Sequence, residues 1–202
     1  MDNELKHFMT WEAPKYMNIL RDVIKDFDYV VDVGAEIGLS ALVFKLINPN
    51  VNVIGYETNP AYCSNAISML FKEYYCREMA ITEYNGYISA HYFIKMDCEG
   101  CEAKYLNVNV PLFGFICLHK LDNVDTSALQ DKLYNEGYVP VFVSQDWKEV
   151  CFMKVKGFKV DTPASWLASI YADSFSVPTV ERKSWEGKNW GLRFKFNVLA
   201  VT

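Results

Sequence analysis

Short apolar runs rich in β-branched residues alternate with helical segments along most of the chain, and this alternation constrains the fold more than any other feature. Buried strands are predicted at residues 29–33, 51–56, 92–97 and 113–118. Helices are predicted between or after them, at residues 39–47, 59–72, 101–106 and 127–136. Strands that alternate with helices form a layered α/β domain with a mostly parallel sheet. We therefore expect an α/β domain of this kind over most of the chain.

Three further segments complete this prediction. Apolar residues before the first strand follow one helical stripe: Tyr16, Ile19, Leu20, Val23, Ile24 and Phe27. Asn85-Gly86 is a strong two-residue hairpin signal between two short apolar runs. Two strands joined by a short turn, at residues 138–143 and 150–155, predict an antiparallel pair at the sheet edge.

The composition agrees with a folded domain. Of the 202 residues, 51% are hydrophobic and 22% are charged, which excludes a disordered or collagen-like chain. The net charge of −5 argues against broad electrostatic binding to nucleic acid or to an anionic membrane. The aromatic fraction of 15% suits either a dense core or an aromatic-lined ligand site.

The six cysteines are too few for a small disulfide scaffold. Cys98 and Cys101 form a C-x-x-C pair, which can serve in packing, in redox chemistry or in zinc binding. A second pair of ligands at zinc spacing is missing, so zinc is the weakest of the three and no metal site is predicted. We expect mostly free thiols that pack in the core.

The N-terminal residues are charged, and no apolar run is long enough to span a membrane. These features predict a soluble, cytoplasmic protein. Residues 1–156 are expected to form one domain, and residues 157–202 an aromatic-rich extension. The extension holds eight of the aromatic residues and ends in a strand-like alternation, so we expect it to pack on the domain or to form a homo-oligomer interface.

Acidic residues follow three of the predicted strands. Asp32, Glu57 and Asp97 each lie at or just beyond a carboxyl end, which is where ligands bind in open α/β sheets. Glu57 stands at the end of the second strand, where an acid can bind ribose hydroxyls.

The glycine turn after the first strand narrows the choice of cofactor. Gly34 and Gly38 let the backbone approach a ligand closely. The middle glycine of the dinucleotide fingerprint is absent, which disfavours NAD and FAD, and no phosphate-binding Gly-Lys-Ser/Thr loop occurs.

Three ordered motifs resemble a known family. The segments 31–38 and 53–60 look like the cofactor half of an S-adenosylmethionine-dependent methyltransferase. The run Ile94-Lys95-Met96-Asp97-Cys98-Glu99-Gly100-Cys101-Glu102 resembles the signature of the FkbM-type methyltransferases, and Ala80-Ile81 resembles their adenine-side segment. The resemblance covers roughly residues 28–156. It implies a Rossmann-like methyltransferase fold, with a seven-stranded sheet and helices on both faces. It also implies an enzyme that acts mostly on hydroxyl oxygens of sugars or other small metabolites.

The resemblance also implies roles for individual residues. Glu57 would hold the ribose hydroxyls, and Asp97 would lie near the reactive methyl group. The residues implied to contact S-adenosylmethionine are Asp32, Gly34, Ala35, Glu36, Gly38, Glu57, Thr58, Ala80, Ile81 and Asp97. The candidates for a base toward a hydroxyl acceptor are Asp97, Glu99 and His119.

Two positions depart from the family pattern. Glu36 replaces the usual Asn, and the strand that ends at His119 has Cys117 where the family tends to have an acid. We therefore carry a second hypothesis, a degenerate fold that serves as a binding or assembly module. Methyl transfer to protein or nucleic acid is a third hypothesis, and the acidic balance disfavours nucleic acid as the acceptor.

Overall fold

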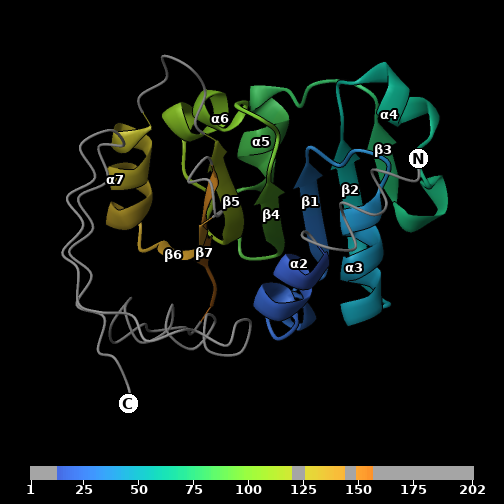
Figure 1. Cartoon of the computed structure of the whole chain (residues 1–202), viewed down its shortest axis with the longest axis horizontal. Helices are drawn as coiled ribbons and strands as arrows, with labels where there is room; N and C mark the ends of the chain where they lie inside the picture. Colours follow the sequence, from blue (N-terminus) through green and yellow to red (C-terminus); the bar gives the residue numbers. More distant parts are fainter. Residues whose placement is uncertain (1–12, 120–125, 144–148, 157–202) are drawn as a thin grey trace, which may run out of the picture.

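The computed structural model describes residues 13–119, 126–143 and 149–156 and contains one seven-stranded sheet (Figure 1). The strand order is β3-β2-β1-β4-β5-β7-β6. Strands β1 to β5 pair in parallel, whereas β7 runs antiparallel to both β5 and β6. The strands are β1 (Tyr29–Val33), β2 (Asn52–Tyr56), β3 (Glu73–Tyr75), β4 (Tyr92–Met96), β5 (Gly114–His119), β6 (Val139–Val143) and β7 (Glu149–Lys154). The predicted mostly parallel sheet with an antiparallel edge is confirmed.

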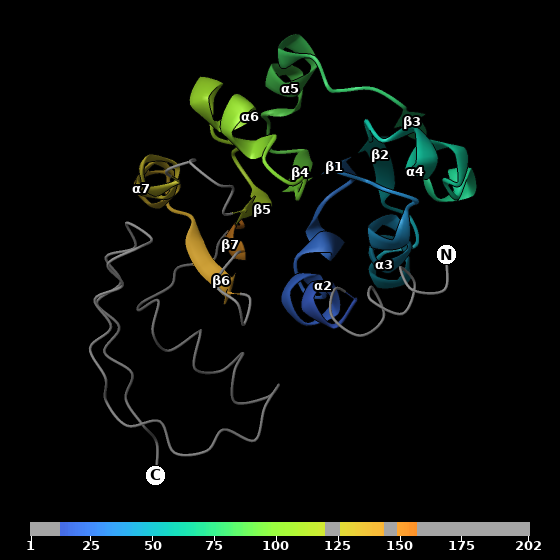
Figure 2. The same cartoon turned by 45° about the horizontal axis from the view of Figure 1, so that its top comes forward.

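Helices cover both faces of this sheet (Figure 2). Helices α2 (Ala13–Leu20) and α3 (Leu39–Ile47) lie on one face. Helices α5 (Ile81–Tyr87), α6 (Glu102–Val108) and α7 (Ser127–Asn135) lie on the other. A short helix, α4 (Pro60–Ser64), follows β2 and begins at the N-cap Asn59, whose side chain accepts a hydrogen bond from the Ala61 amide.

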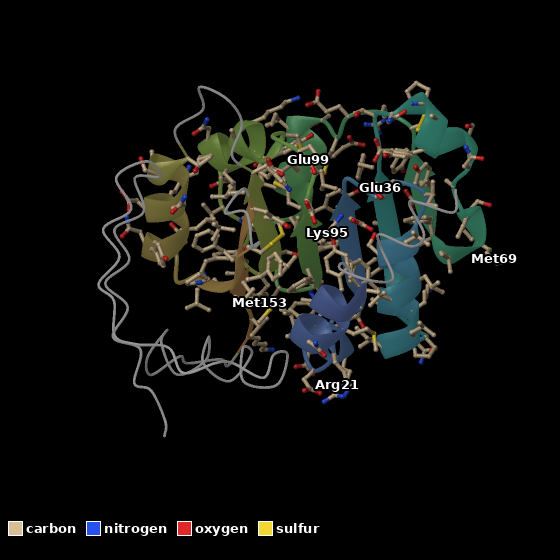
Figure 3. The ribbon with its side chains drawn as sticks, in the orientation of Figure 1. Arg21, Glu36, Met69, Lys95, Glu99 and Met153 are labelled. Atoms are coloured by element: carbon tan, nitrogen blue, oxygen red, sulfur yellow. A yellow bond between two sulfur atoms is a disulfide. The ribbon has the colours of Figure 1, made fainter. Side chains whose placement is uncertain are left out.

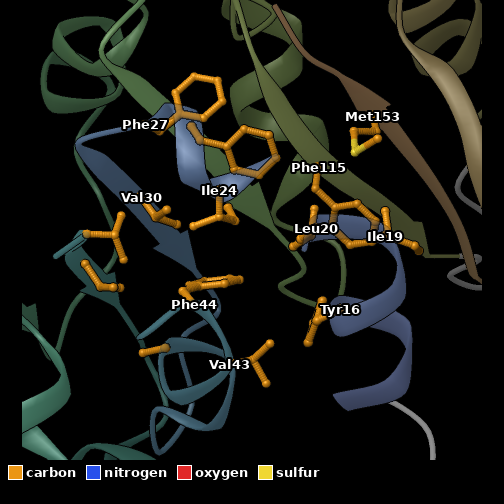
Figure 4. Packing of buried hydrophobic residues seen from close by; sticks show 14 of the residues in the cluster. Tyr16, Ile19, Leu20, Ile24, Phe27, Val30, Val43, Phe44, Phe115 and Met153 are labelled. Atoms are coloured by element: carbon orange, nitrogen blue, oxygen red, sulfur yellow. The ribbon is translucent and has the colours of Figure 1, made fainter. Parts of the chain in front are cut away.

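Aromatic residues fill the core between α2, α3 and the sheet (Figure 4). The ring of Tyr16 packs edge-on against Phe44 and Phe115, and Phe27 packs against Phe93. This packing accounts for part of the high aromatic content. Residues 157–202, with the predicted extension and its interface, lie outside the described residues.

Two predicted elements are wrong, and tertiary pairing explains both. Asn85-Gly86 belongs to the last turn of α5 and not to a hairpin, because the Tyr84 ring is buried and anchors that helix. The predicted helix at 59–72 stops at Ser64, and the chain then turns into β3, which pairs with β2 at the sheet edge. The segment after α4 is also hydrogen-bonded to the turn that follows β1, because the Ile67 amide donates to the Ile37 carbonyl.

The first predicted helix is shorter than its apolar stripe. Helix α2 ends at Leu20, and a 3-10 turn at Ile24–Asp26 follows it. The break lets Phe27 pack between Phe93 and Phe113, so five of the six stripe residues are still buried.

The expectation of free thiols is wrong. All six cysteines form disulfides: Cys63–Cys76, Cys98–Cys101 and Cys117–Cys151. Because the cytosol keeps most thiols reduced, these pairs lend the predicted cytoplasmic location no support. Among the described residues, no helix has the length and apolar character needed to cross a membrane.

Candidate functional site

A row of polar side chains crosses one face of the sheet near the carboxyl ends of its central strands. Side chains alternate between the two faces along a strand. Asp32, Lys95, Asp97, His119 and Glu149 have the same parity as neighbours that pack against α2 and α3. Asp32 is the register partner of Lys95, and His119 is the register partner of Glu149. Strand register therefore brings these five residues onto one face.

Asp32 and Lys95 form a buried ion pair. Lys95 Nζ lies 2.9 Å from Asp32 Oδ1, and the two side chains are 3% and 0% exposed. Burial alone lowers the pKa of Lys95, but the carboxylates of Asp32 and Asp97 outweigh it and raise that pKa. Lys95 Nζ also donates to the Gly34 carbonyl at 2.7 Å, and Ser40 donates to Asp32. Asp32 therefore positions Lys95, and Lys95 in turn holds the glycine turn through the Gly34 carbonyl.

The glycine turn is pressed against the chain that follows β4. A Cβ atom added to Gly34 would lie 2.0 Å from the Asp97 carbonyl oxygen, and Gly34 has a φ of +80°. Only glycine satisfies both conditions. Glu36 also has a left-handed φ, of +46°, a conformation in which Asn is enriched. Glu36 therefore stands in a backbone conformation that asparagine adopts more readily than glutamate.

Backbone amides hold the Glu57 carboxylate in place. Its Oε1 accepts hydrogen bonds from the Thr58 and Asn59 amides, both at 2.7 Å, and its Oε2 accepts one from the Glu36 amide at 2.9 Å. A carboxylate can accept about four hydrogen bonds, so Oε2 retains capacity for one more donor. The β1 turn is thus joined to the end of β2 through Glu57 and to the end of β4 through Gly34.

Asp97 is the first acid of a second group, over β4, β5 and β7. The Tyr16 hydroxyl donates to Asp97 Oδ2 at 2.8 Å. Asp97 Oδ1 lies 3.3 Å from His119 Nε2, and Glu99 Oε1 lies 3.6 Å from the same nitrogen. The three predicted candidates for a base, Asp97, Glu99 and His119, therefore do meet in space.

A further carboxylate reaches the other side of the imidazole. Glu102 Oε1 lies 3.2 Å from His119 Nδ1 and also accepts a hydrogen bond from the Cys98 amide at 3.0 Å. Burial alone lowers the pKa of His119, but the hydrogen bond with Glu102 and the charges of Asp97 and Glu99 raise it to about 9. The imidazole is therefore a cation at neutral pH in a mainly anionic group.

The remaining predicted site residues lie around these two groups. The Gly34 and Ala35 amides donate to the Tyr56 carbonyl, and Gly38 is the N-cap of α3. Ala80 and Ile81 begin α5, where the Ala80 amide donates to Glu83. Glu36 and Glu99 both lie toward the upper edge of the sheet in Figure 3, whereas Arg21 lies at the opposite end.

The sequence interpretation missed four residues of this arrangement: Tyr16, Lys95, Glu102 and Glu149. Lys95 could have been recognised from the sequence, because a lysine within an otherwise apolar strand needs a buried partner. Tyr16 follows the apolar stripe of α2, so its hydroxyl carried no separate signal. Glu149 could be placed only through its register with His119.

No protein-family model matches the sequence, and none of the curated proteins matches it. The fold does match solved structures. The M. capricolum TrmK structure, solved with S-adenosyl-homocysteine, superposes with a TM-score of 0.51 at 11% identity, over 71% of this chain and 68% of that one. The chain shares the fold of that structure.

Two other similar structures carry methyltransferase names. The precorrin-6y C5,15-methyltransferase of Geobacter metallireducens is 14% identical, with a TM-score of 0.47, over 70% of this chain and 86% of its own. TomG, an O-methyltransferase of Streptomyces achromogenes solved with S-adenosylmethionine, is 9% identical, with a TM-score of 0.46, over 72% of this chain and 80% of its own. Identities this low bear on the fold alone, and the fold assignment rests on the strand order and on TrmK.

Proposed function

We propose that the protein is an S-adenosylmethionine-dependent methyltransferase of the FkbM type that methylates a hydroxyl oxygen of a sugar or other small metabolite. The observation that carries the proposal is the oriented Glu57 carboxylate. Three amides hold it beside a turn in which Gly34 leaves no room for a side chain. The Lys95-Met96-Asp97 segment of the FkbM-like signature supports the same function, because Lys95 and Asp97 bracket that turn.

The residues present fit the cofactor. The free acceptor position on Glu57 Oε2 suits a ribose hydroxyl, and the turn at 34–38 suits close approach by the methionine part. Ala80 and Ile81, at the start of α5, are assigned to the adenine side, as the resemblance implies. Asp32 acts through Lys95 and the turn, since its side chain is fully buried.

The bound cofactor supplies an electrophilic methyl group on a sulfonium sulfur. The protein must then place an acceptor oxygen in line with that methyl group and remove its proton, and positioning provides most of the acceleration. Asp97 is the proposed proton acceptor, because it lies next to the turn and also faces His119. Tyr16 and His119 orient the Asp97 carboxylate, and Glu102 orients His119. Glu99 contacts the same imidazole from an exposed position.

The strand order gives the cofactor and the methyl acceptor different strands of the sheet to bind over. Glu57 follows β2 and the glycine turn follows β1, while His119 and Glu149 lie on β5 and β7 beyond Asp97. A cofactor that spans β2, β1 and β4 leaves the ends of β5 and β7 for the hydroxyl acceptor.

Calorimetry with S-adenosylmethionine and S-adenosylhomocysteine tests the proposal on the full chain. Both should bind, and Glu57→Ala should weaken binding by about 1–3 kcal/mol through loss of a charge-assisted hydrogen bond. Glu136→Ala is the matched control, because Glu136 is exposed at the end of α7 and should leave affinity unchanged. A folded protein that binds neither compound at millimolar concentration would contradict the proposal and favour a binding or assembly module.

A further inference from the structure

We propose that Asp97, His119 and Glu149 form a binding site for a divalent first-row transition metal ion at the ends of β4, β5 and β7. The three residues offer ligand atoms that all lie within 4.8 Å of one another. Two ligands 2.1 Å from an ion lie about 3.0 Å apart at an octahedral angle and about 3.4 Å apart at a tetrahedral angle. The 3.3 Å between Asp97 Oδ1 and His119 Nε2 falls within this range before any ion is present.

Glu102 gives independent support for an ion on this imidazole. A histidine that ligates a metal usually has its other ring nitrogen hydrogen-bonded to a carboxylate, which fixes the tautomer and the ring orientation. Glu102 is 3% exposed and lies 3.2 Å from His119 Nδ1. Its contact leaves Nε2 directed toward Asp97, as a ligating nitrogen requires.

The charge of the group also favours a cation. Asp97, Glu99 and Glu102 surround one imidazole, and Glu149 lies on the neighbouring strand in register with it. The Lys95 ammonium interacts electrostatically with Asp97, but it is paired with Asp32 at 2.9 Å. An ion that replaces the Nε2 proton, which is released to solvent, would reduce the repulsion between these carboxylates.

The types of ligand atom narrow the choice of metal ion. Two carboxylates with one imidazole suit Mn²⁺ or Fe²⁺ better than a thiolate-seeking ion. Cys117 and Cys151 also lie near Glu149, but their disulfide removes both thiolates from the set. The role of the ion in catalysis rests on the proposed function: it would bind the acceptor oxygen over β5 and lower the pKa of that hydroxyl.

Mn²⁺ is the probe for this site. The full-length protein, freed of metal with a chelator and kept non-reducing, is titrated with Mn²⁺ while electron paramagnetic resonance reports the free ion. One ion should bind per chain and should broaden the NMR signals of the His119 ring. Glu149→Gln should remove this binding, Glu102→Gln should weaken it by about 10–100-fold, and Glu136→Gln should leave it unchanged.

Circular dichroism reports the folding of each sample, and binding of S-adenosylhomocysteine, measured on the same samples, separates the two proposals. A wild-type protein that binds the nucleoside but no Mn²⁺ would overturn the metal site and leave the proposed function standing. Mn²⁺ binding without S-adenosylhomocysteine binding would contradict the proposed function and leave the metal site standing. Mn²⁺ binding that survives in folded Glu149→Gln and His119→Asn would also overturn the site.

Discussion

Glu102 Oε1 lies 3.2 Å from His119 Nδ1, and its side chain is 3% exposed compared with 12% for Asp97 on the other side of the ring. This contact is the largest influence that raises the pKa of His119, to about 9. In metal-free protein, Glu102→Gln should therefore return that pKa toward its ordinary value of 6.5. NMR titration of the ring measures the change. Glu99→Gln is the control with a smaller expected effect, because Glu99 is 81% exposed. An unchanged pKa in Glu102→Gln would remove Glu102 from this role.

The same raised pKa predicts how stability depends on pH. A group whose pKa is higher in the folded state contributes stability that is complete below its unfolded pKa and is lost as the pH rises through its folded pKa. For His119 this window runs from 6.5 to about 9. The free energy of unfolding of the metal-free wild type should fall across it, by up to about 3 kcal/mol. Urea unfolding at a series of pH values tests this. The prediction is contradicted if the free energy of unfolding of the wild type stays constant between these pH values, as it should in His119→Asn.

The buried pair of Asp32 and Lys95 should be costly to break. Asp32→Asn leaves the Lys95 ammonium buried without its counter-charge, so we expect a loss of about 3–5 kcal/mol in urea unfolding. The combined replacement Asp32→Asn and Lys95→Met should cost less than Asp32→Asn alone, because it removes the uncompensated charge. Equal losses would show that the charge is not the cause.

Two glycines offer a matched pair of substitutions. Gly34→Ala places a Cβ atom 2.0 Å from the Asp97 carbonyl oxygen at a φ of +80°, so it should destabilise the fold and abolish cofactor binding. Gly86→Ala meets nothing within 4 Å and lies inside α5, so it should stabilise by about 0.5–1 kcal/mol. Thermal unfolding and calorimetry together measure both effects. Wild-type cofactor affinity in Gly34→Ala would contradict the proposed role of the turn.

Local pattern predicts the central fold well, because the strands beside the site are continuous apolar runs. The strands β1, β2, β4 and β5 and the edge pair β6 and β7 all lie where their patterns place them. Prediction failed at 65–91, where β3 is three residues long and polar and where Asn85-Gly86 mimics a hairpin turn. In that stretch, contacts with distant residues such as Ile37 and Val53 decide the conformation.

The site could be predicted only where a residue type is unusual for its place. Acids at strand ends pointed to Asp32, Glu57 and Asp97, but Asp32 proved to be a buried partner of Lys95. Glu102 and Glu149 were missed, because strand register and the start of α6 bring them to His119. The Cys117–Cys151 disulfide was missed for the same reason, since these two residues are neighbours only through the pairing of β5 with β7.

The central claim is tested most directly by a crystal structure of the protein with S-adenosylhomocysteine. We predict a ribose hydroxyl within hydrogen-bond distance of Glu57 Oε2, the methionine part along the turn at 34–38, and the sulfur directed toward Asp97. A nucleoside bound elsewhere, with Glu57 still held only by the amides of Glu36, Thr58 and Asn59, would contradict the claim.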